Sequence, residues 1–209
     1  MTQGSEHGFD QEYWEQHWQD RRDSGPGSVG ANLPHPYLAR EVSGLVPGTA
    51  LEAGCGEGTE AVWLASHGWR VTAADISTEA LTRAAERAAS SGASECVQWV
   101  EADLTVWDPG RQFDLVTTHY AHPAMPQLEF YDRIAHWVAP GGTLLIVGHL
   151  HGHGHGHGPP PEATATAAAV TSRLEDTEWV IVTAEERQRT PAGRAIPLHD
   201  VVMCATRRG

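Results

Sequence analysis

The feature that most constrains the fold is an alternation of strand and helix signals that begins near Ala50. Extended apolar segments lie at 49–54, 69–75, 96–103, 113–120 and 143–148, and helical patterns separate most of them. Strands that alternate with helices form a parallel sheet with helices on both faces, because the crossovers are right-handed. The sequence therefore predicts a doubly wound α/β domain with five parallel strands.

The last third of the chain breaks this alternation. Two further strand-like segments, 178–189 and 198–208, are joined by a short stretch rich in turn residues. That stretch leaves no room for a crossover helix, so the two strands should pair as an antiparallel hairpin. The prediction is a Rossmann-like, seven-stranded mixed sheet. Helices are expected over 60–67, from Ser77 to 90–92, over 127–142 and over 162–174.

Length and local composition indicate one main domain with a short N-terminal attachment. The chain has 209 residues, enough for one domain. Residues 1–36 are polar and irregular, and Trp14 and Trp18 would share one face of a helix. We expect this segment to be a lid over a ligand, with a helix packed on the core as the alternative. Residues 37–209 would form the main domain, whose oligomeric state the sequence does not indicate.

The charge balance limits the class of partner. The 14 basic residues are all arginine and face 27 acidic residues, for a formal net charge of -13. This balance argues against a nucleic-acid partner, because binding phosphates requires many cations. No apolar run is long enough to span a bilayer, and the start lacks the pattern of a signal peptide. Three widely separated cysteines fit a reducing compartment as small apolar fillers, so we expect a cytoplasmic protein acting on a small molecule.

The strongest local signal is the segment LEAGCGEG at 51–58, placed where a strand turns into a helix. Its glycines let the backbone approach a ligand closely, next to the positive end of the helix. A dinucleotide-binding loop has a third glycine where this chain has Thr59. Glu52 would also repel a pyrophosphate, whereas it would attract a cation such as the sulfonium of S-adenosylmethionine (SAM). A nicotinamide oxidoreductase is therefore disfavoured.

Two aspartates follow the next two strands. Asp75 ends the second strand, where a carboxylate can accept hydrogen bonds from both ribose hydroxyls. Asp103 ends the third and can accept a hydrogen bond from an amine such as that of adenine. Each has a simpler alternative, as a helix cap before Ser77 or as a surface turn residue. One nucleoside at the carboxyl edge of the sheet would explain both aspartates and Glu52 together.

With these residues in place, the chain resembles the class I SAM-dependent methyltransferases. The matching segments are LEAGCGEG, VTAADIS, VEADL, FDLVTTHY and VAPGGTLLIVG, in the family's order. The segment WLASHGWRVTAADIS is also similar to the thiopurine and tellurite methyltransferase-like branch. The resemblance implies a SAM-binding fold and a small-molecule acceptor, although the family often has Asp where Glu52 stands. The cofactor contacts that it implies are Glu52, Gly54, Cys55, Gly56, Gly58, Asp75, Ile76, Asp103, Leu104 and His119.

Methyl transfer from a sulfonium is an in-line displacement, so the protein must mainly hold two ligands in line and exclude water. Soft sulfur, selenium or tellurium nucleophiles need little further help, whereas hydroxyls and protonated amines need a base. His119 and His122 are the candidate bases, with a cofactor-lining residue and a plain loop residue as their alternatives. We expect proximity and desolvation to dominate. The walls of the acceptor site should come from 9–36, 119–131 and 149–161.

A histidine–glycine tract at 148–158 follows the fifth strand. Its alternate histidines would lie on one side of an extended chain and could bind zinc, nickel or copper; they are His149, His151, His153, His155 and His157. The alternative is a low-complexity loop with incidental metal affinity. The second hypothesis for function is therefore a histidine-rich metal-binding or metal-homeostasis protein on a methyltransferase-like fold.

Overall fold

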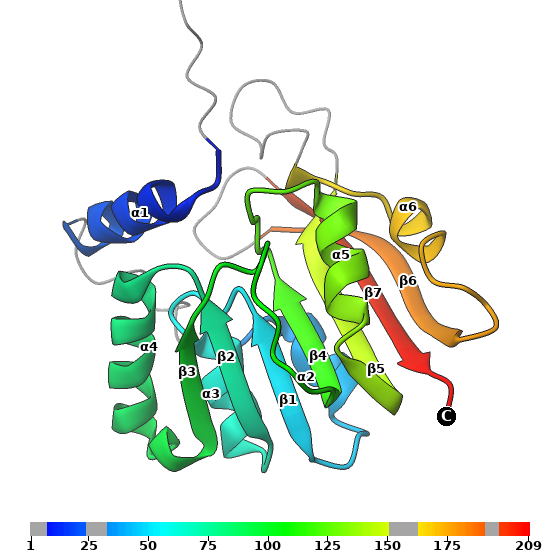
Figure 1. Cartoon of the computed structure of the whole chain (residues 1–209), viewed down its shortest axis with the longest axis horizontal. Helices are drawn as coiled ribbons and strands as arrows, with labels where there is room; N and C mark the ends of the chain where they lie inside the picture. Colours follow the sequence, from blue (N-terminus) through cyan, green and yellow to red (C-terminus); the bar gives the residue numbers. More distant parts are fainter. Residues whose placement is uncertain (1–7, 24–32, 151–162, 191–196) are drawn as a thin grey trace, which may run out of the picture.

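A computed structural model describes residues 8–23, 33–150, 163–190 and 197–209. Its centre is a seven-stranded sheet in the order β3-β2-β1-β4-β5-β7-β6 (Figure 1). The strands are β1 Thr49–Ala53, β2 Arg70–Asp75, β3 Val97–Glu101, β4 Phe113–His119, β5 Val138–His149, β6 Trp179–Arg189 and β7 Leu198–Arg207. The first five strands pair in parallel, and β7 pairs antiparallel with both β5 and β6. The predicted Rossmann-like mixed sheet is confirmed.

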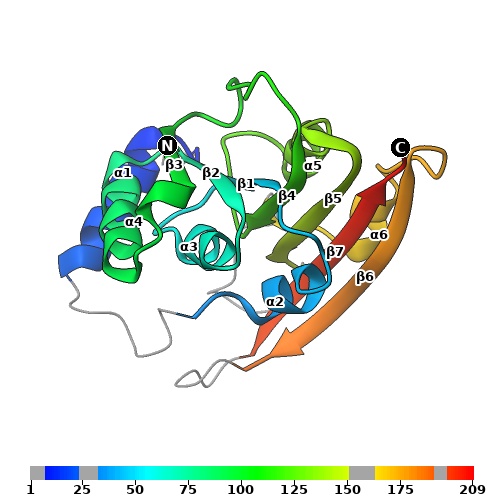
Figure 2. The same ribbon diagram turned by 90° about the horizontal axis from the view of Figure 1, so that it is seen from below.

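Helices cover both faces of the sheet. They are α1 Gln11–Asp23, α2 Pro36–Val42, α3 Thr59–Ser66, α4 Thr78–Ser91, α5 Gln127–Ala135 and α6 Ala167–Thr171, with a short 3-10 turn, η1, at Ser94–Cys96. The view from below separates α2 and α3 on one side of the sheet from α5 on the other (Figure 2). No helix in the described part of the chain is long and apolar enough to cross a membrane.

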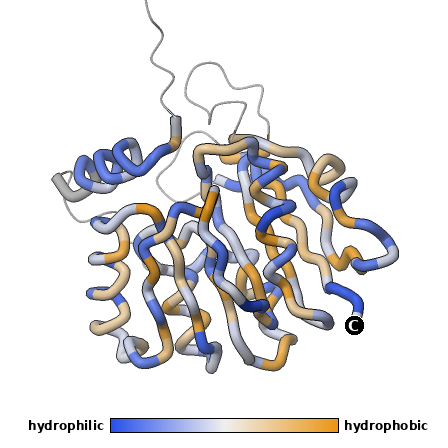
Figure 3. Tube along the Cα trace, viewed as in Figure 1, coloured by the Kyte–Doolittle hydropathy of each residue, from blue (hydrophilic) through white to orange (hydrophobic). Residues whose placement is uncertain are grey.

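Side chains that alternate along the strands divide the core into two clusters. Leu51 and Val116 pack with Phe130 of α5 on one face. Leu115 packs with Leu38 of α2 and with residues of α3 and α4 on the other face. Parallel strands buried on both faces are apolar along most of their length, and Figure 3 shows hydrophobic central strands beside a hydrophilic α1. A polar side chain inside these strands therefore needs a specific partner.

The helix predicted over 127–142 is shorter than expected. It ends at Ala135, and the chain re-enters the sheet at Val138 as the start of β5. Val138 pairs with Phe113 before the register shifts, so its burial in the sheet replaces the burial that a longer helix would give. Gly141 has a φ of 77°, which ends any helical continuation.

Two smaller predictions were also wrong. The helix expected over 162–174 is confined to α6, because Thr164 is extended and pairs with His149, and the cap of α6 comes only at Thr166. Cys55 and Cys204 are buried as expected, whereas Cys96 is exposed.

Candidate active site

The turn after β1 brings the backbone into close contact with the loop that follows β4. Gly54 has a φ of 77°, and its N–H donates to the carbonyl of Ala74. A Cβ at this glycine would lie 2.2 Å from the Cβ of Ala121, so only glycine allows the two segments to approach. Gly58 serves a different purpose, because a Cβ there would meet Trp99 and Ala84 in the packing of α3 and α4.

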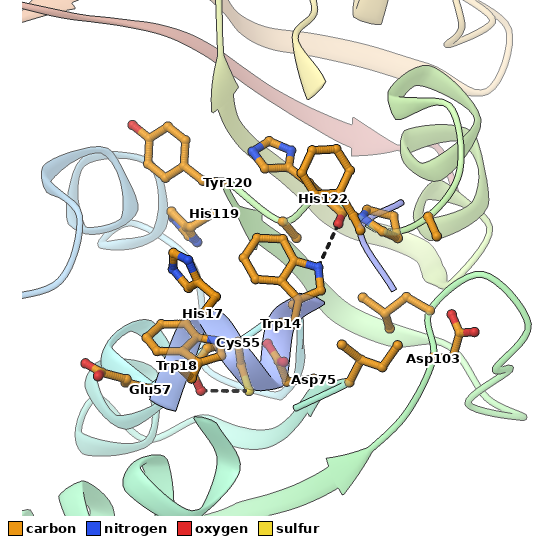
Figure 4. A pocket seen from close by; sticks show the side chains of 18 of the residues that line it. Trp14, His17, Trp18, Cys55, Glu57, Asp75, Asp103, His119, Tyr120 and His122 are labelled. Carbon is orange, nitrogen blue, oxygen red and sulfur yellow. Dashed lines mark hydrogen bonds between the residues drawn. The ribbon is translucent and has the colours of Figure 1, made fainter. Parts of the chain in front are cut away.

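A cavity of about 480 Å³ lies at the carboxyl ends of the parallel strands, under α1 (Figure 4). This is the edge at which doubly wound sheets bind ligands. Eight of the predicted cofactor contacts line it: Gly54, Cys55, Gly56, Asp75, Ile76, Asp103, Leu104 and His119. The other two, Glu52 and Gly58, do not line the cavity.

Asp75 is held rigidly at the end of β2. One carboxylate oxygen accepts from the N–H of Gly56 at 2.7 Å, and the other accepts from the N–H of Ser77 at 3.0 Å. Burial raises the pKa of Asp75, and these two hydrogen bonds act in the opposite direction. Each carboxylate oxygen retains a second lone pair for a ligand. Ser77 also caps α4 as expected, accepting from the N–H of Ala80.

Asp103 is a turn residue whose side chain also lies at the cavity. It accepts from the N–H and the hydroxyl of Thr105, as a turn residue does. It also lines the cavity beside Leu104. We define the carboxylate wall as the four acidic residues that line the cavity: Glu57, Glu60, Asp75 and Asp103. None of the described lining residues is an arginine, although Arg83 and Arg87, outside the lining, pair with Glu57. The other three carboxylates of the wall favour a ligand with positive charge.

Glu52 lies behind the cavity instead of in it. Its side chain is 1% exposed and accepts from Nδ1 of His119 at 3.0 Å. Glu52 pairs with Thr117 of β4, and His119 lies two residues further on the same face of the sheet. Burial alone would lower the pKa of His119, but the Glu52 carboxylate outweighs this effect and raises it. Glu52 therefore faces the cavity only through His119.

The opposite side of the cavity is lined by histidine and aromatic side chains. We define the imidazole wall as the imidazoles and aromatic rings that line this side: Phe9, Trp14, His17, His119, Tyr120, His122 and His149. His17, Trp14 and Trp18 point from α1 towards the cavity (Figure 4). Among the members of this wall, the sequence singled out His119 and His122 as candidate bases, Trp14 as a residue of the lid, and His149 as a metal ligand. For the other members it predicted only the segments that supply them. The spacing of His17 three residues after Trp14 was the one signal available for it.

A partly buried polar cluster supports Tyr120 from behind. Its hydroxyl donates to Asp200 at 2.7 Å and lies 3.0 Å from both Nε2 of His35 and a guanidinium nitrogen of Arg189. Burial, with smaller contributions from His119 and Arg189, lowers the pKa of His35 to about 3. Tyr120 has a φ of 57°, which is strained for a non-glycine residue and is held by these contacts.

Helix α1 is docked over the cavity by specific polar contacts. The carboxylate of Glu15 accepts from the hydroxyl of Ser77 at 3.0 Å and from the N–H of Thr78 at 2.7 Å, at the positive end of α4. Arg83 donates to the carbonyl of Trp18 at 2.6 Å. The indole N–H of Trp14 donates to the carbonyl of His122 at 3.2 Å. These contacts join α1 to both sides of the cavity.

The predicted metal site lies largely outside the described residues. His151, His153, His155 and His157 are among the residues that the structure does not describe, whereas His149 lines the cavity. In the described ranges, no group of three or more histidine, cysteine or acidic side chains could hold a metal ion. Metal binding by the tract stays a prediction.

Comparisons with known proteins agree with this geometry. The family described as a methyltransferase domain matches residues 50–142. Thiocyanate methyltransferase 1 of Brassica oleracea is 36% identical over 103 residues, 49% of this chain and 45% of that protein. "Probable thiol methyltransferase 2" of Arabidopsis thaliana is 28% identical over 138 residues, 63% of this chain and 59% of that protein. The chain thus spans about half the length of these curated relatives.

The architecture extends the similarity beyond the matched segment. Magnesium protoporphyrin IX methyltransferase from Synechocystis, solved with bound S-adenosylhomocysteine (SAH), superposes with a TM-score of 0.69 and 20% identity. The superposition covers 95% of this chain and 97% of that one. At this identity the superposition shows a shared fold. Residues 50–142 thus match a methyltransferase domain, and the chain shares the fold of this SAH-bound methyltransferase.

Proposed function

We propose that this protein transfers the methyl group of SAM to a small-molecule acceptor whose reacting atom is sulfur or another soft nucleophile. The observation that carries the proposal is the carboxylate wall. Asp75 and Asp103 follow neighbouring strands and line one cavity whose described lining residues include no arginine. This set of groups suits a nucleoside with a cationic sulfonium and disfavours a pyrophosphate.

The residues present fit the cofactor in their chemistry. In this proposal Asp75 would accept hydrogen bonds from the ribose hydroxyls, and Asp103 would accept one from the adenine amine. Ile76 and Leu104 supply apolar surface for the base, and the backbone of Gly54 to Gly56 is open to the methionine part. Glu52 would act on the sulfonium only through His119. When bound, SAM supplies an activated methyl group.

The segment before the main domain has a role in this proposal. Helix α1 covers the cavity with aromatic side chains and is tied to α4 through Glu15. We infer that residues 1–36 form a lid that excludes water and that residues 37–209 form the methyltransferase domain. Excluding water strengthens the electrostatic interactions inside and holds the two reactants together.

The finer assignment of a soft acceptor has two supports. The two similar plant proteins have thiocyanate and thiol in their names. The imidazole wall combines polarisable rings with few fixed charges, which suits a small polarisable acceptor better than a phosphate or a nucleic acid.

Calorimetric titration tests the proposal. SAM and SAH should bind with micromolar or tighter dissociation constants, whereas NAD should give no heat of binding. At about 100 times its dissociation constant, SAH should stabilise the folded protein by about 2.7 kcal/mol in thermal unfolding. Mass spectrometry should then detect methylated product from thiols or metalloid anions before phenols or amines. Binding of NAD in preference to SAH, or methylation of amines alone, would contradict the proposal.

A further inference from the structure

A short hydrogen-bond relay fixes the imidazole of His122 in one orientation. The buried side chain of Gln127 donates from its amide nitrogen to the carbonyl of Ala121 at 3.0 Å. A backbone carbonyl can only accept, so this contact sets which end of the amide faces which way. The amide oxygen of Gln127 therefore faces Nδ1 of His122, at 3.1 Å.

This orientation determines the tautomer of His122. An amide oxygen can only accept, so Nδ1 of His122 must carry the hydrogen. In the neutral imidazole the lone pair is then on Nε2. Among the described residues, Nε2 of His122 has no hydrogen-bond partner, and the side chain lines the cavity. The relay thus leaves a proton-accepting nitrogen available to a ligand.

Ring contacts and a backbone hydrogen bond hold His122 in place. Its ring stacks on His149, the titratable side chain that faces it from β5, at 5.3 Å between centroids. The apolar ring of Phe9 lies 5.7 Å away, and Trp14 of α1 holds its backbone carbonyl.

The second candidate base, His119, differs from His122 in the partner of its Nδ1 and in the burial of its Nε2. Its Nδ1 is paired with Glu52, and its Nε2 is buried and has no partner in the described part of the chain. An acceptor atom in the cavity therefore meets Nε2 of His122 more readily than Nε2 of His119.

We propose that His122 is the catalytic base that takes the proton from the acceptor atom, and that Gln127 is the positioning residue that aims Nε2 at the cavity. This inference rests on the proposed function and narrows its substrate class to acceptors that carry a proton, above all thiols. The S–H bond of the acceptor breaks and its proton passes to Nε2. The electron pair left on sulfur forms the new S–CH₃ bond while the methyl–sulfonium bond breaks, giving a thioether, neutral SAH and imidazolium.

The inference separates two kinds of soft acceptor. A thiol has a pKa of about 8.5, so it is mostly protonated at pH 7 and gains from a base. Thiocyanate ion has no proton to lose and gains nothing from one. Comparing the two acceptors in one enzyme therefore isolates proton transfer from methyl transfer.

The test compares His122→Asn with wild type on both acceptors, using 2-mercaptoethanol and potassium thiocyanate at saturating SAM. At pH 7 the variant should lose about 10²-fold or more in kcat for the thiol, and the ratio of thiol to thiocyanate rates should fall by at least 10-fold. Raising the pH should restore much of the thiol rate, because solvent then supplies the thiolate. His136→Asn, an exposed histidine at the end of α5, is the matched control.

To test Gln127 as a positioning residue, the experiment must measure a property that would not change if Gln127 only stabilised the fold. In Gln127→Glu the carboxylate still accepts from Nδ1 but favours the imidazolium, so the pH profile of the thiol reaction should shift to higher pH. In the protein without ligands, nitrogen-15 NMR should show the Nδ1–H tautomer of His122, assigned by its absence from the His122→Asn spectrum.

Three results would overturn the inference. The thiol and thiocyanate rates of His122→Asn could fall by the same factor, the wild type could methylate thiocyanate but no thiol, or NMR could show the Nε2–H tautomer. Failure of the proposed function looks different, since SAH would then not bind the wild type at all. The NMR spectrum shows which nitrogen of His122 carries the hydrogen, whether or not the protein binds SAH.

Discussion

The two sides of the cavity are built from different kinds of sequence. The carboxylate wall comes from the turn after β1, the start of α3, the end of β2 and the turn after β3, which lie within about fifty residues of one another. The imidazole wall comes from α1 and the residues just before it, from the end of β4 and the loop that follows it, and from the end of β5, which are far apart in the chain. In the proposed function, the first wall binds the cofactor and the second wall binds the acceptor. The predictions below test whether the two walls act separately.

The largest effect should come from Asp75 in the carboxylate wall. Asp75→Ala should weaken SAH binding by about 100-fold, or about 2.7 kcal/mol, because a charged acceptor for ligand hydroxyls is lost. Variants of His122 should change SAH affinity much less. Calorimetry measures both, with Asp108→Ala, an exposed aspartate on the loop before β4, as the control. Equal losses of affinity for Asp75→Ala and His122→Asn would show that the two walls do not act separately.

A smaller effect is expected at the contact that joins the walls. Glu15→Gln removes the charge that α1 places at the positive end of α4, and should cost about 1 kcal/mol of stability. Because this contact docks the lid, SAH affinity should fall only a few-fold, with faster dissociation. Glu12→Gln is the matched control, since Glu12 lies exposed on the same helix. If both variants release SAH at the same rate, the docking contact does not hold the lid over the cavity.

The sequence predicted two of the four residues of the carboxylate wall, Asp75 and Asp103, because they lie at the ends of buried strands. It did not single out Glu57 or Glu60, which also line the cavity. Topology alone then brings Asp75 and Asp103 to one edge of the sheet. Glu52 shows the limit of this reasoning. The sequence gives the spacing of Glu52 from the glycines. Its burial against His119, however, depends on which residues of β1 and β4 pair with each other. Sequence spacing contains no information on that pairing.

The imidazole wall could be predicted only as a set of segments. His17, His122 and His149 line one cavity although they come from α1, from the loop after β4 and from the end of β5, and no local periodicity relates them. The tautomer of His122 depends on Gln127, whose role requires the position of the Ala121 carbonyl. The error over 127–142 has a similar origin, because Val138 suits a helix locally but pairs with Phe113 in the sheet. In each case the local sequence allowed more than one conformation or tautomer, and a contact made in the folded chain determined which one forms.

The most direct measurement is a crystal structure of the protein with SAH bound. The account predicts ribose hydroxyls on Asp75, the adenine edge beside Asp103, and the sulfur directed at the imidazole wall within reach of His122. A nucleoside bound away from both aspartates, or a sulfur atom facing away from His122, would contradict it.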